Sequence, residues 1–586
     1  MTERFSHELP FGASLDGSLA RFRIWAPSTE RLTLEVDGAE YAMAGDGGWF
    51  TAAVPAAAGA RYKYRTGDGM TFPDPASRAQ DGDVHDASFV VDPRSFEWKH
   101  PEWRGRPWHE AVVYELHPGV FGGFDGVRAQ LPRLKALGVT AIELMPIADF
   151  PGAANWGYDG VLPFAPDTSY GTPDQLKALV DAAHGHGLMI MLDVVYNHFG
   201  PDGAYLHAIA RPFFRDDLTT PWGASIDFRR EEVRSYFINN ALYWLQEYRF
   251  DGLRFDAVHE ISEDDFLEEM AATIRREVDR HVHLVLEHEG NAARLLRTGP
   301  DGRGFDAQWT DDVHHCLHVL LTGESEGYYE DFQDPIVQLA RAMADGFVYQ
   351  GEPSKALGKL RGEPSAHLPT TAFVICLQNH DQVGNRAMGE RLAVLANLDG
   401  LRAAMLLLCL SPFIPMLFMG DEVTSTTPFL FFTSHNDALA ELVREGRRAE
   451  FKGFAAFLDP ARRAKILDPN LRSTFDRSVP DMMGDSSYVQ RHLATRRDRV
   501  MPGIPGCVTA GVAVLGKHSL VARWRLGTGE VLGIAINLGH DPAILECPVA
   551  ELIGESGPGG WDALKAGKLL EQSSVAWIEH APGTDA

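Results

Sequence analysis

The stretch FDGLRFDAVH, residues 250–259, decides the fold prediction for this chain of 586 residues. Its apolar Leu253 and Phe255 alternate with the charged Arg254 and Asp256, and this period of two predicts a strand with one apolar and one charged face. A guanidinium two positions from a carboxylate favours the ionised carboxylate, which can attack an electrophilic carbon. Taken alone, the pair is better explained as a structural ion pair at a strand end. The neighbouring segments instead favour a functional role for this carboxylate.

Eight apolar, strand-like segments follow one another between residues 107 and 420, with amphipathic helical segments between many of them. The strand candidates are residues 112–116, 141–145, 189–195, 252–258, 284–287, 305–309, 372–377 and 414–419. Helical periodicity ends at residue 138 in the first unit, and it covers residues 173–187, 233–248 and 263–282 in the next three. This repetition predicts an α/β fold with a closed (β/α)8 TIM barrel. A doubly wound open sheet is the alternative, which eight consecutive units disfavour.

Short alternating strands without helical periodicity lie on both sides of this region. At the N-terminus they predict a small β-sandwich, resembling a carbohydrate-binding module, that either binds carbohydrate or only caps the barrel. From residue 509 onward they predict a C-terminal β-sandwich domain. We therefore expect three domains, at residues 1–95, 96–505 and 506–586.

Composition limits the classes of partner. The chain has 54 Lys and Arg residues against 81 Asp and Glu, a net charge of −27, which disfavours nucleic acid and anionic membranes and suits a neutral substrate. Its five cysteines are scattered and predict reduced thiols. The N-terminus shows no signal-peptide pattern, and the longest apolar run is too short for a membrane span. We expect a cytoplasmic protein; its oligomeric state is not predicted.

Four of the predicted strands end in carboxylate or imidazole side chains. These ends are residues 193–198, 254–259, 287–289 and 378–381. In a (β/α)8 barrel the carboxyl ends of the strands meet at one rim, where catalytic groups gather. Clustered carboxylates move one another's pKa values apart, so that one can donate a proton while another stays ionised. Glycoside cleavage needs such a pair, because one carboxylate attacks and the other protonates the departing oxygen.

These rim segments resemble the four signature regions of the α-amylase family of glycoside hydrolases. Within that family the chain is most similar to the malto-oligosyltrehalose trehalohydrolases. The similarity rests on NWGYDG (155–160), WTDDVHH (309–315), GESEGYY (323–329), QNHDQVGNR (378–386) and TPFLFFTSH (427–435). It implies a hydrolase of trehalose biosynthesis that cleaves the α-1,4 bond next to the trehalose end of malto-oligosyltrehalose.

The resemblance also implies a role for each matching residue. Asp256 would be the nucleophile, Glu287 the acid and then the base, and Asp381 the group that binds sugar hydroxyls and helps to distort the ring. The anomeric configuration would be retained. The residues implied to bind or support the substrate are Tyr158, Asp193, His198, Arg254, His259, Trp309, Asp311, Asp312, His314, Asn379, His380 and Arg386.

Several alternatives stay open at this point. Glu289 shares a strand face with Glu287, although Glu287 follows the apolar run directly and is favoured. Tyr328 suits core packing as well as sugar stacking. The segment after Asn197 lacks the oxygen ligands that Ca²⁺ needs, so we expect neither a metal nor a cofactor. We expect Asn197 to orient the loop that follows it. A related transglycosylase such as a branching enzyme, an α-glucan hydrolase with another substrate, and a non-catalytic glucan-binding protein are the competing functions.

Overall fold

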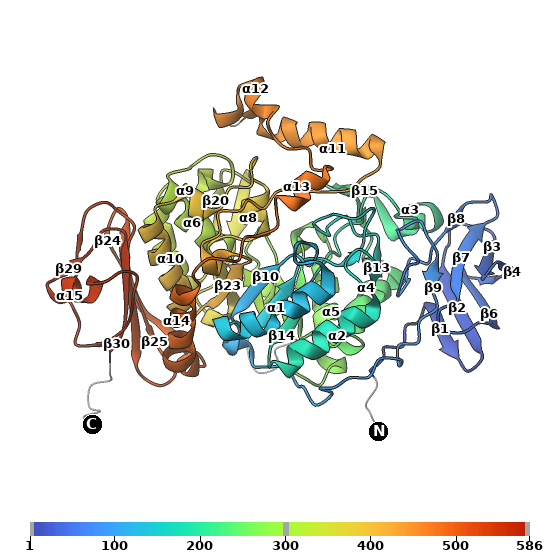
Figure 1. Ribbon diagram of the computed structural model, residues 1–586, viewed down its shortest axis with the longest axis horizontal. Helices are drawn as coiled ribbons and strands as arrows, with labels where there is room; N and C mark the ends of the chain where they lie inside the picture. Colours follow the sequence, from blue (N-terminus) through green and yellow to red (C-terminus); the bar gives the residue numbers. More distant parts are fainter. Residues whose placement is uncertain (1–4, 297–303, 454, 580–586) are drawn as a thin grey trace.

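A central barrel lies between two groups of antiparallel sheets. The computed structural model describes residues 5–296, 304–453 and 455–579. Figure 1 shows the N-terminal sheets on one side of the barrel, the C-terminal sheet on the other, and helices α11 (Asp437–Glu450) and α12 (Pro460–Arg463) rising above it. The predicted fold class is therefore confirmed.

The barrel consists of eight parallel strands, each hydrogen-bonded to the next, with the last paired to the first. In order they are β10 (Val113–Leu116), β11 (Ala141–Leu144), β14 (Met189–Val194), β17 (Gly252–Phe255), β18 (His283–Leu286), β19 (Ala307–Trp309), β22 (Phe373–Cys376) and β23 (Ile414–Phe418). Each lies within or beside a predicted segment. The closed order excludes the doubly wound open sheet.

The alternation along β17 sorts its side chains as predicted. Leu253 and Phe255 pack outward into the core between strands and helices. Arg254 instead lies in the lumen, with its guanidinium 4.1 Å from the centre of the Trp309 ring. Apolar side chains fill the lumen below, including Met191 and Val285. The lumen therefore has an apolar floor and a charged upper layer, as the active-site face of such a barrel requires.

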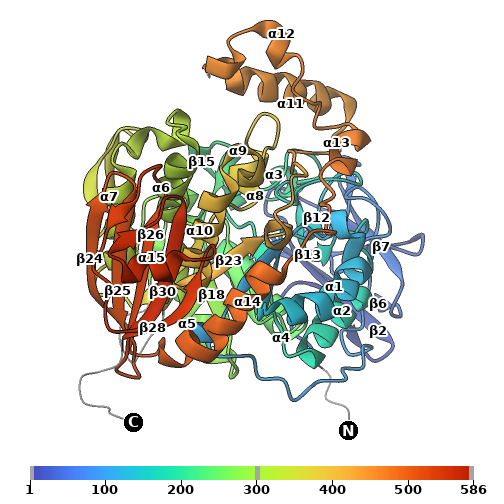
Figure 2. The ribbon, with the colours of Figure 1, turned by 60° about the vertical axis from the view of Figure 1, so that its left-hand side comes forward.

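Helices cover the outside of the barrel, as Figure 2 shows. They include α1 (Gly123–Leu137), α2 (Pro173–Gly185), α4 (Glu231–Gln246), α5 (Asp264–Glu277), α6 (Asp311–Thr322), α7 (Pro335–Asp345), α10 (Leu398–Leu410) and α14 (Ser487–Thr495). The helix predicted over 263–282 ends earlier, because the backbone of Val278 turns extended and leads the chain into β18. Between β18 and β19 the described residues include a 3-10 turn, Ala293–Leu295, and no α-helix.

The N-terminal strands form two sheets, as a sandwich requires. One sheet holds β1 (Gly12–Asp16), β2 (Leu19–Trp25), β6 (Trp49–Pro55) and β5 (Ala44–Asp46); the other holds β4 (Ala39–Ala42), β3 (Leu32–Val36), β7 (Arg61–Thr66), β8 (Thr71–Phe72) and β9 (Ser88–Phe89). Arg78 pairs with Glu247, just after α4, at 2.5 Å, and both side chains are buried. This contact ties the sandwich to the barrel.

The C-terminal strands form a five-stranded antiparallel sheet. In sheet order they are β24 (Val508–Gly516), β25 (Ser519–Arg525), β26 (Val531–Asn537), β30 (Ser573–Glu579) and β28 (Glu551–Glu555). One face packs on barrel helices, since Ser574 Oγ donates to the Ala403 carbonyl of α10 at 2.9 Å and Trp524 Nε1 to the Met343 carbonyl of α7 at 3.2 Å. The other face is covered by helix α15 (Gly560–Lys565) and the pair β27 (Ala543–Ile544) and β29 (Lys568–Leu569). The exact domain boundaries stay predictions.

None of the five cysteines forms a disulfide in the structure, and all but Cys547 are buried. Within the described parts of the chain, no helix combines the length and the apolar character needed to cross a membrane.

A buried carboxylate below β17 joins the strand to its neighbours. Asp251 accepts hydrogen bonds from Trp103 Nε1 (2.9 Å), Arg280 Nη1 (2.7 Å), His184 Nε2 (3.0 Å) and the Ile190 amide (3.0 Å). Burial alone would raise its pKa, but His184 and Arg280 hold that pKa down to about 2. The ionised form of Asp251 is therefore part of the folded state.

We expect Asp251→Asn to lower the free energy of unfolding at pH 7 by about 3–5 kcal/mol, because the buried Arg280 guanidinium loses its charged partner. A carboxylate with a depressed folded-state pKa stabilises above its unfolded pKa, about 3.9, and this stabilisation is lost as pH falls through the folded value. The difference between wild type and variant should therefore shrink from pH 4 to pH 2, as urea titrations would measure. Asp279→Asn, at an exposed carboxylate, is the control. A difference independent of pH would contradict this assignment.

Candidate active site

Asp256 follows the last residue of β17 and lies at the rim of the barrel. The chain turns sharply after it, with Ala257 at φ 39°. Arg254 Nη1 donates to Asp256 Oδ1 at 2.7 Å, and Asn197 Nδ2 donates to Oδ2 at 2.9 Å. Both carboxylate oxygens are thus held by donors, and only 8% of the residue surface is exposed. This fixes the direction in which the carboxylate can attack.

Glu287 follows β18, the next strand around the barrel. Its Oε2 accepts a hydrogen bond from the Ala257 amide at 2.8 Å and lies 2.8 Å from Arg254 Nη2. One guanidinium therefore contacts both Asp256 and Glu287. Glu289 is exposed, so the structure brings Glu287 and not Glu289 to the predicted nucleophile.

A chain of polar groups continues behind this pair. Asp193 Oδ2 accepts from Arg254 Nη1 at 2.7 Å and from the Tyr158 hydroxyl at 2.6 Å. The Tyr158 oxygen lies 2.8 Å from His380 Nε2, and the two rings are stacked. Burial raises the pKa of Asp193 to about 7 even though Arg254 opposes this shift. Burial lowers the pKa of His380, but the Asp381 and Glu115 carboxylates outweigh it and raise the value to about 10.

Asp381 lies in the short helix α8 (His380–Gly384) and remains open. Asn379 caps this helix by accepting from the Asp381 amide at 2.9 Å. Asn385 Nδ2 donates to Asp381 Oδ1 at 3.0 Å, and 38% of the Asp381 side chain is exposed. The carboxylate can therefore accept hydrogen bonds from sugar hydroxyls.

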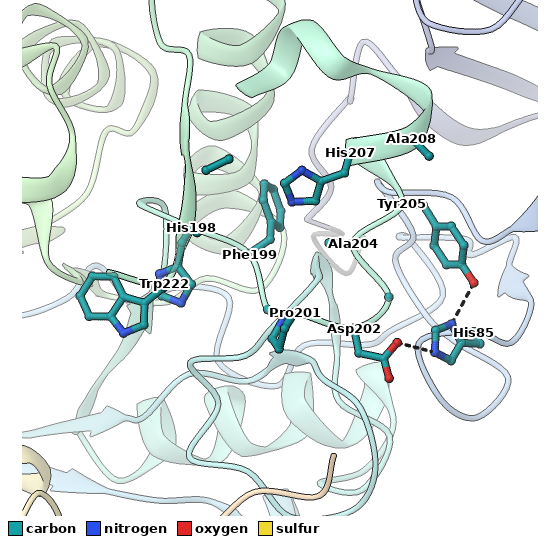
Figure 3. A pocket seen from close by; sticks show the side chains of 14 residues that line it. His85, His198, Phe199, Pro201, Asp202, Ala204, Tyr205, His207, Ala208 and Trp222 are labelled. Atoms are coloured by element: carbon teal, nitrogen blue, oxygen red, sulfur yellow. Dashed lines mark hydrogen bonds and ion pairs between the residues drawn. The ribbon is translucent and has the colours of Figure 1, made fainter. Parts of the chain in front are cut away.

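A pocket of about 550 Å³ adjoins this centre at His198 (Figure 3). The His198 ring stacks on Trp222, with 4.9 Å between ring centres, and Trp222 is half exposed at the tip of the hairpin β15 (Phe214–Thr220) and β16 (Gly223–Ile226). On the far side, His85 lies 2.8 Å from the Tyr205 hydroxyl and 3.1 Å from Asp202. The pocket extends the site toward the N-terminal domain.

The other predicted residues lie around this centre with partners of their own. Asp312 is fully buried and contacts Arg361 at 2.9 Å, which fits structural support better than direct substrate contact. His314 is buried, and its Nε2 lies 3.2 Å from the Tyr329 hydroxyl. Arg386 forms a two-point ion pair with Glu324 at 2.7 and 3.0 Å.

Four further residues considered in the sequence analysis are closer to the reacting groups or to the open rim. Trp309 supports the Arg254 guanidinium. Burial raises the pKa of Asp311 to about 7, with a further increase from Glu287. The His259 side chain is partly exposed, and Tyr328 is 66% exposed, which disfavours a packing role for that ring.

Four residues of the site were missed or given a lesser role. Glu115 contacts His380, and Glu143 lies near His380 in the lumen. Trp222 lies on a hairpin that was not predicted from the sequence. Asn197, expected to orient its loop, also binds Asp256 directly. Glu115 and Glu143 could have been found, because each is an acidic residue inside an apolar barrel strand.

Asn197→Ala should lower kcat by about 10- to 100-fold with little change in KM, since it removes a hydrogen bond to the charged nucleophile. Steady-state kinetics on the oligosaccharide substrate would measure this split. Asn239→Ala, on the outside of the barrel in α4, is the matched control. A rise in KM at unchanged kcat would instead assign Asn197 to substrate binding.

No group of three or more ligating side chains is placed to hold a metal ion among the residues that the structure describes.

Comparison with known proteins shows the family of the chain. The family model described as "Alpha amylase, catalytic domain" matches residues 70–216, and a domain of unknown function, DUF3459, matches residues 509–577. Malto-oligosyltrehalose trehalohydrolase of Rhizobium sp. strain M-11 is 41% identical over 567 residues, 91% of this chain and 93% of that one. The 1,4-alpha-glucan branching enzyme GlgB of Dechloromonas aromatica is 34% identical over 284 residues, 42% of this chain and 45% of that one.

A crystal structure of an alpha amylase candidate from Salmonella typhimurium superposes with a TM-score of 0.92 at 40% identity, covering 98% of this chain and 100% of that one. Fold and site together define an enzyme of the α-amylase class of glycoside hydrolases. More narrowly, the chain belongs to the malto-oligosyltrehalose trehalohydrolase family.

Proposed function

We propose that this chain is a retaining hydrolase that cleaves the α-1,4 bond next to the trehalose end of malto-oligosyltrehalose and releases trehalose. The observation that carries the proposal is the single guanidinium of Arg254 in contact with both Asp256 and Glu287 at the barrel rim. Two carboxyl groups bridged in this way lie close together, as in retaining enzymes, where about 5–5.5 Å separates them. The similarity to trehalohydrolases over most of the chain supports the substrate.

In the first step, Asp256 attacks the anomeric carbon as Glu287 gives its proton to the bridging oxygen. The carbon–oxygen bond to the aglycone breaks, trehalose leaves with that proton, and a β-glycosyl ester forms on Asp256. In the second step, Glu287 takes a proton from water, which attacks the same carbon and frees Asp256. Two inversions give net retention.

The surrounding groups fit the transition state of this reaction. Asp381 is open to accept sugar hydroxyl hydrogen bonds, and the stacked Tyr158 and His380 rings border the same space. Positive charge develops on the sugar ring, and preorganised carboxylates stabilise it. The pocket beside His198 offers room for further sugar units, with Trp222 as an aromatic surface. A cytoplasmic location, a malto-oligosaccharide or α-glucan substrate and the lack of a nucleic-acid or membrane partner stay predictions.

A branching transglycosylase is the second candidate, because part of the chain resembles a branching enzyme. There a sugar hydroxyl replaces water in the second step. Incubation with maltotetraosyl-trehalose and, separately, with maltohexaose distinguishes the two by chromatography. Free trehalose from the first, with little change in the second, is the expected result. Longer chains or α-1,6 bonds without trehalose would contradict the hydrolase.

A further inference from the structure

We propose that Glu115 is a positioning residue for this cleavage. Glu115 keeps both ring nitrogens of His380 protonated and so fixes the hydrogen-bonded chain Tyr158–Asp193–Arg254 behind the nucleophile. The inference rests on the proposed function for the reaction, whereas its structural basis stands on contacts that need no substrate. Glu115 belongs to β10 and lies at one end of this hydrogen-bonded chain, and Asp256 lies at the other end.

The hydrogen-bond directions around His380 decide its protonation. Glu115 accepts from the His380 amide at 3.1 Å and lies 2.5 Å from Nδ1, so a carboxylate faces that ring nitrogen. Tyr158 donates its only hydroxyl hydrogen to Asp193 at 2.6 Å. The Tyr158 oxygen, 2.8 Å from His380 Nε2, can therefore only accept. With Asp193 ionised, both nitrogens therefore donate, which makes the ring an imidazolium.

The chain then runs without a break from β10 to the nucleophile. Imidazolium Nε2 donates to Tyr158, Tyr158 to Asp193, and Arg254 donates to both Asp193 and Asp256 at 2.7 Å. Loss of the Nε2 proton would turn the Tyr158 hydroxyl toward His380 and leave Asp193 Oδ2 with Arg254 as its one remaining donor. Arg254, held by that oxygen, would then be less fixed against Asp256.

The charged and titratable groups around His380 favour the imidazolium. They are Glu115 from β10, Asp381 from α8 at 3.5 Å, Tyr158 from its loop, Arg254 from β17, Glu143 from β11 and the neighbouring His117. Arg254 opposes the positive ring, and the two carboxylates outweigh it. Burial lowers the pKa of His117 to about 4, so this imidazole is neutral. The carboxylates of Asp381 and Glu115 therefore both stabilise the protonated His380 ring, and Glu115 is the buried one of the two.

Glu143 provides a matched control in the same lumen. It is also buried, and burial together with Asp193 and Glu115 raises its pKa well above the usual range, which favours the neutral carboxyl. A glutamine there resembles the carboxyl already present. At Glu115 the same substitution removes a negative charge.

The test measures kcat/KM for trehalose release from pH 5 to pH 9, as the ratio of variant to wild type. For Glu115→Gln we expect a ratio that is constant at low pH and falls at least about tenfold between pH 6 and pH 8, as His380 loses a proton. Glu115→Asp should restore part of the alkaline activity. Glu143→Gln should show a ratio that does not vary with pH. A ratio for Glu115→Gln that is equally low at every pH would overturn the proposal, because it would reveal only structural damage.

A second measurement does not depend on activity. Nitrogen NMR of ¹⁵N-histidine wild-type protein, with the His380 signal assigned from His380→Asn, should show two protonated ring nitrogens at pH 8. A neutral His380 ring at that pH would overturn the proposal directly. Absence of trehalose release by the wild type would instead overturn the proposed function and leave this result intact.

Discussion

Asp256→Asn is expected to lower kcat by about 10⁴-fold or more, because the amide cannot form the glycosyl ester on which both steps depend. The loss should be in kcat with KM little changed, since the amide occupies the same volume between Arg254 and Asn197. Steady-state assays of trehalose release measure it. Asp174→Asn, at an exposed carboxylate on α2, serves as the control.

Chemical rescue separates a missing nucleophile from a damaged site. In Asp256→Gly, azide can enter the vacated space and attack an α-maltosyl fluoride from the face that Asp256 would have used. The expected product is the β-glycosyl azide. Recovery of an α-azide, or activity of Asp256→Asn within tenfold of wild type, would contradict the role of Asp256.

Glu287→Gln is the second large effect, with an expected loss of about 10³- to 10⁴-fold in kcat on the oligosaccharide, whose leaving group needs a proton. Fluoride needs no such proton, so the first step on an α-glycosyl fluoride should remain fast. The two substrates compared in rapid-quench experiments give this contrast. Equal losses on both would mean that Glu287 does not act as the acid.

The matched control for this substitution is two residues away. Glu289 lies on the same strand extension but is exposed and outside the contacts of Arg254. Glu289→Gln should keep activity close to wild type on both substrates. A large loss there, with Glu287→Gln active, would reverse the assignment that the structure supports.

The barrel and its rim could be predicted because both depend on local periodicity. Alternation of Leu253, Arg254, Phe255 and Asp256 fixes which side chains face the lumen, and parallel strands bring their carboxyl ends together. The choice between Glu287 and Glu289 was harder. Both share one strand face, and only the turn after Asp256, which points the Ala257 amide at Glu287, separates them.

Long-range pairings between residues could not be predicted in this way. Glu115 meets His380 across 265 positions of sequence, and Tyr158 meets Asp193 from a loop. Asp312 belongs to a matching motif, yet its ion pair with Arg361 buries it. Such contacts follow from tertiary packing, which no spacing in the sequence records. The predicted role of Asp312 is the one that the geometry supports least.

Trapping the glycosyl intermediate tests the central claim most directly. In Glu287→Ala the first step on α-maltotriosyl fluoride needs no acid, whereas hydrolysis of the intermediate lacks its base, so the intermediate should accumulate. Acid quench, pepsin digestion and mass spectrometry should then find one maltotriosyl group on the peptide that contains Asp256. Fluoride release without any adduct, or an adduct on another residue, would contradict the retaining mechanism proposed for this chain.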